Sequence, residues 1–371
     1  MNTRVLLCLG IFAVMALSNA IVPVLPAYGE GTIAQGALYS AYFLGAFLLV
    51  LPAGVLADRT GPLPLVKIGL ALTLMSGLLL LTGSSVFIIV IYRFLEGIGA
   101  GLFVPSALSL INAEPDHETG SGYFMALLNI GLVAGLIGSG WLAEVTESPE
   151  SGIFFFTILS LIPAAFSIFL RPGPIKEFPP ESFREIGRRL VRVIRVYFWL
   201  WVSTIIILGI TGALTVLYPE YSGLSPGILG LTIAAMSLST AATVVLVSHA
   251  HLPPIPIIRV ASLGMAAAVL CVILTPFSFI AVGAFAGVVM IGQLAFLAES
   301  EVHQGVVMGL FNTASYAGMT FLPFVAGFIA EISSFMIAFM VLALSGVLVA
   351  ITIGQCDCRL SGVKVTLQER D

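Results

Sequence analysis

The chain has 371 residues, of which 59% are hydrophobic and only 9% are charged, and its formal net charge at pH 7 is −4. About a quarter of the residues in soluble domains are charged, so this composition excludes an ordinary soluble domain. Apolar runs of about twenty residues recur along nearly the whole chain, without the alternating polarity of membrane β-strands. The sequence therefore predicts an all-α polytopic membrane protein.

Apolar runs separated by glycine, proline and charged residues predict twelve membrane spans. A cleavable signal peptide is the alternative for the first run, because Arg4 precedes apolar residues that end at Ala20. Apolar sequence continues to Pro26, however, and favours a full span. The predicted spans are roughly residues 5–27, 36–56, 65–83, 86–111, 120–143, 152–170, 196–218, 226–248, 256–275, 277–298, 305–330 and 333–354.

The basic residues are distributed unevenly between the two sides that twelve spans create. Fourteen of the fifteen Lys and Arg residues fall on the side of both termini, and the other, Arg93, lies within a span. The opposite loops have no Lys or Arg and carry Glu30, Glu144, Glu147, Glu150, Glu220 and Glu331. The positive-inside rule then places both termini in the cytosol, with the chain crossing the cytoplasmic (inner) membrane many times.

A polar stretch from Arg171 to Arg195 separates the sixth span from the seventh. Its arginines recur at helical spacing, which predicts an amphipathic helix on the anionic cytosolic leaflet. Acidic residues interrupt the basic run and argue against nucleic-acid binding. The predicted organisation is a six-helix bundle at 1–171, a cytosolic linker with this helix at 172–195, a second six-helix bundle at 196–354 and a cytosolic tail at 355–371.

A shift of 187 residues aligns the fifth span with the eleventh. Six identical pairs then fall into register without a gap; they are Gly122/Gly309, Phe124/Phe311, Gly131/Gly318, Gly140/Gly327, Ala143/Ala330 and Glu144/Glu331. The match predicts two parallel repeats, the arrangement of transporters whose halves rock about a central site.

A short charged segment, Gly54 to Lys67, joins the second and third spans and is expected to be a loop between antiparallel helices. Within it, Gly54, Leu56, Ala57, Asp58, Arg59 and Gly61 resemble the signature G-x-L-A-D-R-x-G-R-K of the major facilitator superfamily, with Pro62-Leu63 in place of the basic pair. The resemblance covers essentially the whole chain. It implies twelve helices in two six-helix bundles related by a pseudo-two-fold axis, and transport without enzymatic activity or a cofactor.

The resemblance also implies a role for this segment in gating. In the family the segment stabilises the closed cytosolic side, with its Asp near the start of helix eleven, which lies here around Gln304 and Gly305. The predicted gating residues are Gly54, Asp58, Arg59 and Gly61. A loop that only sets the topology is the alternative.

The fourth span carries Arg93, Glu96, Gly97, Gly99 and Gly101, which are similar to the R-x-x-x-G-x-G motif of the family. An Arg inside a span costs at least about 2.5–3.5 kcal/mol on insertion scales and needs a partner or water. Glu96, three residues later on the same helix face, can be that partner. Two interpretations stay open: a structural ion pair, or a charged site in a central cavity where Glu96 carries a coupling proton.

Two further elements resemble drug-efflux branches of the family. Leu17 to Pro26 fits L-x-x-x-x-x-P-x-x-P, and the glycines of the fifth span partly match the glycine ladder called the antiporter motif, with Leu136 at its Pro position. Close helix packing is predicted for six glycines of the spans: Gly97, Gly99, Gly101, Gly131, Gly135 and Gly318.

Few other polar side chains lie inside the spans. With Arg93 and Glu96, they are the candidates for a substrate or proton pathway, and hydrogen bonding between helices is the alternative for each. They are Asn19, Asn129, Gln293, Asn312 and Tyr316.

The sequence therefore predicts a secondary active transporter, expected to be a monomer, that exports a small apolar or amphipathic solute by alternating access. Its expected partners are that solute, protons as the candidate coupling ion, and membrane lipid, with no nucleic acid. A metabolite uptake carrier or an uncoupled facilitator is the alternative. An intramembrane enzyme is disfavoured because no catalytic constellation appears in the spans. The four cysteines are too few and too scattered for a disulfide framework, and the close pair Cys356 and Cys358 lacks the second Cys or His pair that a metal site needs.

Overall fold

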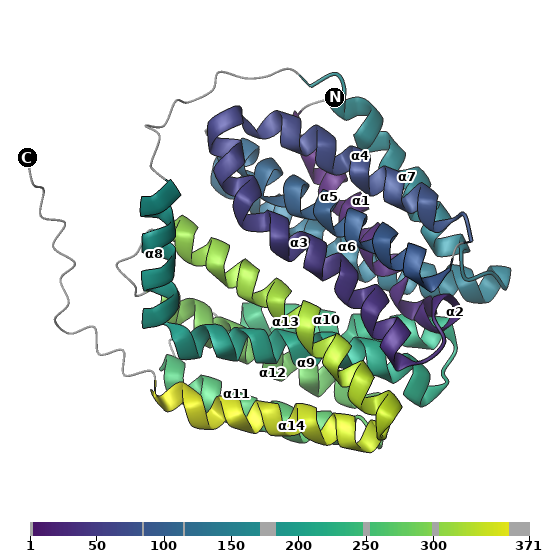
Figure 1. Cartoon of the computed structure of the whole chain (residues 1–371), viewed down its shortest axis with the longest axis vertical. Coiled ribbons are helices and arrows are strands. Elements are labelled where there is room, and N and C mark those ends of the chain that lie inside the picture. The colour runs from purple at the N-terminus through teal and green to yellow at the C-terminus, as the bar shows by residue number, and fades with distance from the viewer. Residues whose placement is uncertain are drawn as a thin grey trace, which may run out of the picture.

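The computed structural model of the chain describes residues 3–83, 85–113, 116–170, 183–247, 253–298 and 304–355. Nearly all of these residues are helical, and no strand occurs within these ranges (Figure 1). The first half contains α1 (Thr3–Ala20), η1 (Val22–Val24), α2 (Leu25–Tyr28), α3 (Thr32–Thr60), α4 (Pro62–Leu80), α5 (Val86–Asn112), α6 (His117–Thr146) and α7 (Ser151–Ser167). The second contains α8 (Phe183–Val196), α9 (Phe198–Ser222), α10 (Pro226–Val247), α11 (Pro254–Cys271), α12 (Ser278–Ala298), α13 (Gln304–Ile332), α14 (Phe335–Thr352) and η2 (Ile353–Gln355).

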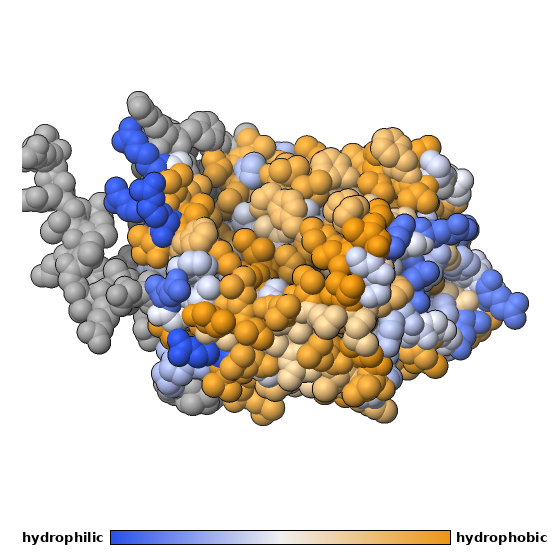
Figure 2. Space-filling view, turned by 60° about the horizontal axis from the view of Figure 1, so that its bottom comes forward, coloured by the Kyte–Doolittle hydropathy of each residue, from blue (hydrophilic) through white to orange (hydrophobic). Residues whose placement is uncertain are grey.

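The helices have the length and composition of membrane spans. Eleven described spans are long and apolar enough to cross a bilayer, the first of them continuous through α1, η1 and α2, and α7 is a shorter apolar helix. Figure 2 shows a broad apolar belt between two polar ends of the molecule. The prediction of an all-α protein with twelve membrane helices is confirmed, and most helix ends lie within a few residues of the predicted ones.

The twelve helices form two six-helix bundles with matching internal contacts. In the first half α6 packs on α1, and in the second half α13 packs on α9. Repeat-related glycines allow both contacts, because a methyl group on Gly131 would crowd the carbonyl oxygen of Phe12, and one on Gly318 would overlap that of Ile205. The bundles meet where α3 packs on α13 and α6 packs on α10. Equivalent helices therefore make equivalent contacts.

Other glycines predicted to pack closely also lie at helix crossings. A methyl group on Gly97 would overlap the carbonyl oxygen of Tyr42 in α3, and one on Gly135 would overlap that of Ala16 in α1. Gly99 faces the backbone of Gly69 in α4, and Gly101 faces α3. Because lipid does not drive helices together by the hydrophobic effect, such close backbone approach contributes much of their packing energy.

The charged segment between the second and third spans is helical, so the expected loop there is wrong in extent. α3 continues to Thr60 and α4 begins at Pro62, which leaves only Gly61 between them. Gly61 has a φ of 82°, a conformation that glycine adopts without strain. Pro62 then starts α4, where its fixed φ suits the first helical turn. One glycine and one proline make the whole turn.

Two basic residues bind the ends of neighbouring helices. Lys67 Nζ donates to the carbonyl oxygens of Ile168, at 3.1 Å, and Leu170, at 2.9 Å, just beyond α7. Arg259 Nε donates to the carbonyl oxygen of Ala350 in the last turn of α14, at 3.1 Å. Cations at helix C-termini satisfy free carbonyl groups and interact favourably with the helix dipole. Lys67, the one cation left of the signature after Gly61, is therefore engaged within its own half.

We expect Gly97→Ala to lower the free energy of unfolding by about 1–3 kcal/mol, because the methyl group would overlap the Tyr42 carbonyl oxygen. Thermal melting of the protein in detergent would measure the change. Gly122→Ala is the matched control, since no atom lies within 4 Å of the added carbon and alanine favours a helix by roughly 0.5–1 kcal/mol. Similar Tm values for the two variants would contradict the close packing of α5 on α3.

Candidate functional site

The helices have two distinct ends. We call the end with the N-terminus, the turn between α3 and α4, and α8 the linker end, and the end with α2 and the start of α3 the opposite end (Figure 1). The candidate site lies along the contact between the two halves, which runs from one end toward the other.

One side of α6 and the equivalent side of α13 face the other half, and we call these sides the interface faces. Residues seven or eleven positions apart lie on nearly the same side of an α-helix, since a turn has 3.6 residues. The interface face of α6 comprises Met125, Asn129, Leu136, Gly140 and Glu144. That of α13 comprises their repeat equivalents Asn312, Tyr316, Pro323, Gly327 and Glu331.

At the opposite end the interface faces pack backbone to backbone on the other half. A methyl group on Gly140 would overlap the carbonyl oxygen of Pro226 at the start of α10. A methyl group on Gly327 would likewise overlap that of Thr32 at the start of α3. The same glycine of each repeat therefore permits the closest approach between the halves.

Two repeat-related carboxylates lie at the helix starts that these glycines contact. Glu331 Oε2 accepts a hydrogen bond from the backbone N–H of Ile33 in the first turn of α3, at 2.7 Å. Glu144 Oε2 accepts one from Ser225 Oγ, just before α10, at 3.4 Å. A negative charge at a helix N-terminus is stabilising by about 0.3–1 kcal/mol. Each half thus binds a helix start of the other half.

Two further hydrogen bonds join the halves at this end. Thr32 Oγ1 donates to the carbonyl oxygen of Gly327, at 2.7 Å, and Gln35 Nε2 donates to Glu220 Oε2 of α9, at 2.6 Å. We call these two bonds, together with the contacts of Glu144 and Glu331, the opposite-end seal. Sequence reasoning did not assign a function to these residues. The identity of Glu144 and Glu331 at a shift of 187 was the signal that pointed to them.

Toward the linker end the same interface faces are exposed. Leu136 on α6 is 1% exposed, whereas Met125 on the same side is 47% exposed and Asn129 is also exposed. Asn312 on the interface face of α13 is exposed too. Predicted pathway residues Asn129 and Asn312 are therefore accessible on the linker side of a closed seal, with the half-buried Tyr316 one turn deeper on α13.

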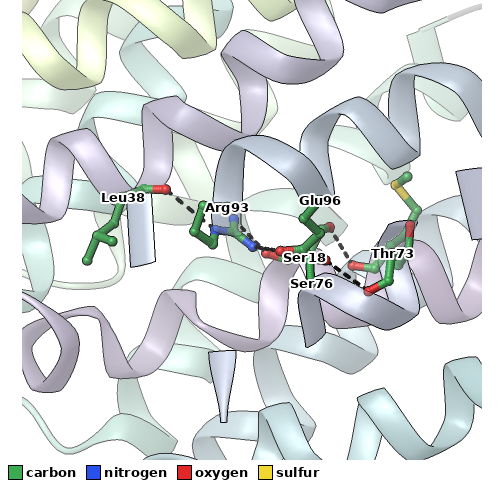
Figure 3. A network of polar contacts seen from close by, with 7 residues as sticks. Ser18, Leu38, Thr73, Ser76, Arg93 and Glu96 are labelled. Atoms are coloured by element: carbon green, nitrogen blue, oxygen red, sulfur yellow. Dashed lines mark hydrogen bonds and ion pairs between the residues drawn. The ribbon is translucent and has the colours of Figure 1, made fainter. Parts of the chain in front are cut away.

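Arg93 and Glu96 form a buried ion pair that joins three helices of the first half. Arg93 Nη1 donates to Glu96 Oε2 at 2.5 Å, and the side chains are 1% and 0% exposed. The guanidinium also donates to the carbonyl oxygens of Ser18 in α1, at 3.1 Å, and Leu38 in α3, at 3.4 Å (Figure 3). The pair thereby binds α1 and α3 to α5.

One oxygen of this ion pair remains available. Glu96 Oε1 is buried and has no hydrogen-bond partner in the described part of the chain. The guanidinium lies 4.9 Å from the ring centre of Tyr42, a cation–π distance. The Tyr42 ring contacts Phe43 at 5.0 Å, and Phe43 contacts Tyr316 of α13 at 6.1 Å. Ring contacts thus extend from the ion pair to the interface face of the other half.

Two predicted pathway residues instead join helices within one half. Asn19 Nδ2 donates to the carbonyl oxygen of Leu132 in α6, at 3.3 Å. Gln293 Nε2 donates to Ser203 Oγ of α9, at 2.8 Å, and Gln293 is fully buried. These contacts match the alternative of helix–helix hydrogen bonding more closely than a pathway.

The predicted gating residues are only partly described. Gly54 lies within α3 with open space beside it, and Gly61 is the turn residue. The side chains of Asp58 and Arg59, and those at the start of α13, lie outside the described residues, as do Cys356 and Cys358. No group of three or more His, Cys, Asp or Glu residues that could hold a metal occurs in the ranges given above.

We expect Arg93→Met to lower the free energy of unfolding by about 3–5 kcal/mol, because it leaves a buried carboxylate without its partner. The double variant Arg93→Met/Glu96→Leu should recover most of this loss, since an apolar pair of similar volume is often as stable as a buried ion pair. Melting of the two variants in detergent would measure both effects. A double variant no more stable than the single one would contradict this account.

Comparisons with known proteins agree with this architecture. The Major Facilitator Superfamily profile matches residues 7–316. The quinolone resistance protein NorA of Staphylococcus aureus (strain MRSA252) is 26% identical over 232 residues, 60% of this chain and 59% of NorA. The methylenomycin A resistance protein of Bacillus subtilis (strain 168) is 31% identical over 134 residues, 36% of this chain and 26% of that protein. The chain thus spans less than two thirds of the length of these relatives.

Solved structures resemble the fold over nearly its whole length. A mutant of the nucleoside transporter NupG has a TM-score of 0.78 at 13% sequence identity, covering 96% of this chain and 100% of that one. The human organic anion transporter MFSD10 has a TM-score of 0.67 at 14% identity, covering 95% and 98%. At such identities the likeness concerns the fold alone.

Proposed function

Because the chain belongs to the major facilitator superfamily, we propose that it is a secondary active transporter that exports a small apolar or amphipathic solute by alternating access, in exchange for protons. Export is supported by relatives that are named for resistance to quinolones and to methylenomycin A. A transporter of this kind needs a site that opens to one side of the membrane at a time.

The observation that carries the proposal is the one-sided closure of the interface faces. Gly140 and Gly327 pack on the other half at the opposite end, while Asn129 and Asn312 on the same faces are exposed toward the linker end. This geometry is that of a carrier open to one side. The Lys and Arg residues gather at the linker end, so the positive-inside rule makes this the cytosolic side, where an exporter collects its solute.

Glu96 is the proposed proton carrier. Its Oε1 atom has no partner among the described residues, so a proton can be accepted there while Oε2 keeps its bond to Arg93. Protonation would weaken the attraction to Arg93, which also binds α1 and α3. The proposed cytosolic gate consists of Asp58 and Arg59 at the end of α3.

We expect Glu96→Gln to abolish solute-driven proton movement, because the amide cannot take up or release the coupling proton. The full chain would be reconstituted into liposomes with an internal pH-sensitive dye and tested with drugs, amino acids, sugars and organic acids. A proton flux evoked by one class would identify the substrate class and the coupling together.

Glu150→Gln is the matched control, because Glu150 is an exposed glutamate outside the proposed pathway. It should keep the proton flux of the wild type. A flux that Glu96→Gln leaves unchanged would exclude Glu96 as the carrier. Transport at equal rates with and without a pH gradient would show that the protein is an uncoupled facilitator and not a proton exchanger.

We expect Glu144→Gln/Glu331→Gln to weaken the opposite-end seal, because both helix starts lose a negative partner. Each charge contributes about 0.3–1 kcal/mol, so the population open to the linker end should fall about 3- to 30-fold relative to the other state. The measurement is labelling of Asn129→Cys by a membrane-impermeant maleimide in inverted vesicles, with the four native cysteines replaced by serine.

The double variant should label more slowly than the background protein, and Glu150→Gln in the same background should label at the parent rate. Unchanged labelling of the double variant would show that the two carboxylates do not hold the seal closed.

A further inference from the structure

Helix α8 lies at the left of Figure 1, across the ends of the spans. The proposed transport mechanism assigns no role to its exposed side chains. Three stripes run along its described turns. Val193 is buried, Val191 and Ile194 are 57% and 41% exposed, and the exposed arginines form the third stripe. These arginines are Arg188, Arg192 and Arg195.

The buried stripe attaches α8 to the second half. Trp201 Nε1 of α9 donates to the carbonyl oxygen of Val193, at 3.4 Å. The Tyr197 ring, directly after α8, packs edge-on against Trp201, at 6.4 Å, and against Phe296 of α12, at 5.9 Å. The position of α8 is thus fixed by α9 and α12, and its other two stripes face away from them.

A further exposed apolar side chain, Phe198 at the start of α9, is 51% exposed. Val191 and Ile194 are three residues apart on α8, the spacing of one helix side, and Phe198 follows beyond the break at Tyr197. Water would be unfavourable for such a stripe, whereas the hydrocarbon edge of a bilayer accommodates it. An apolar stripe of this kind favours a position of α8 at the membrane boundary.

The basic stripe lies beside the apolar one on the α8 surface. Arg188, Arg192 and Arg195 make no ion pair or hydrogen bond within the part of the chain that the structure describes. A guanidinium binds phosphate oxygens through two parallel N–H donors. With the apolar stripe in the hydrocarbon edge, these three groups lie at the level of lipid phosphates.

We propose that the arginine stripe of α8 is a binding site for the headgroups of anionic phospholipids. The stripe supplies three positive charges at the depth of the phosphates, and the apolar stripe beside it contacts the acyl chains. Since α8 is attached to α9 and α12, the bound lipid holds the linker end of the second half at the membrane surface.

The test uses the native tryptophans beside α8 as probes of bound lipid. Trp141 is replaced by phenylalanine, which leaves Trp199 and Trp201. The full chain is reconstituted with about 10% phosphatidylglycerol, brominated on its acyl chains, in unlabelled phosphatidylcholine, or with brominated phosphatidylcholine at the same fraction. Quenching by the anionic lipid should show a preference of about tenfold over the neutral lipid and should weaken at high salt.

The variant Arg188→Gln/Arg192→Gln/Arg195→Gln should lose this preference, and the corresponding triple lysine variant should retain it, because charge is the determinant. The matched control removes three basic residues of the tail: Arg359→Gln, Lys364→Gln and Arg370→Gln. Circular dichroism and melting verify that each variant is folded.

Equal quenching by the two lipids in the wild type would overturn the proposal, as would an equal loss of preference in the tail variant. Competition by free inorganic phosphate would assign the stripe to a soluble anion instead. The readout is independent of transport, so neither result depends on the proposed substrate or coupling ion.

Discussion

The backbone contact between the two halves at the opposite end is the constraint on which the rest of the structure depends. Gly140 and Gly327 allow it, since a methyl group at either position would overlap a carbonyl oxygen of the opposing helix. Packed backbone surfaces have discrete arrangements, so such a contact closes or opens as a unit. Glu144 and Glu331 add only about 0.3–1 kcal/mol each, which suits a closure that must also release.

The ion pair of Arg93 and Glu96 lies in the interior of the first half, where it joins three helices. Arg93 donates to α1 and α3 as well as to Glu96, so its position affects three helices. Through Tyr42 and Phe43 its surroundings reach Tyr316 on the interface face of α13. Proton uptake at Glu96 would therefore act on groups that touch the other half directly.

The helix pattern was predictable because only a helical segment that is long and apolar enough can cross a bilayer. The charged segment before Gly61 was predicted as a loop because charged residues mark the end of a membrane span. They do not end the helix, however, and α3 continues beyond the apolar run to Thr60. Asn19 and Asn129 looked alike in sequence, yet Asn19 binds the carbonyl oxygen of Leu132 while Asn129 is exposed. The rotation of each helix decides this difference, and neighbouring helices determine that rotation.

The sequence by itself determined that the chain is a twelve-helix membrane protein of two repeats, because apolar run length and residue identity at a fixed shift are local properties. It also placed Arg93 and Glu96 three residues apart inside the fourth span. Only the tertiary structure decided which end is closed and which residues close it. Thr32 and Gly327 are 295 positions apart, and their contact exists only because two bundles, each packed by its own glycines, bring α3 and α13 together.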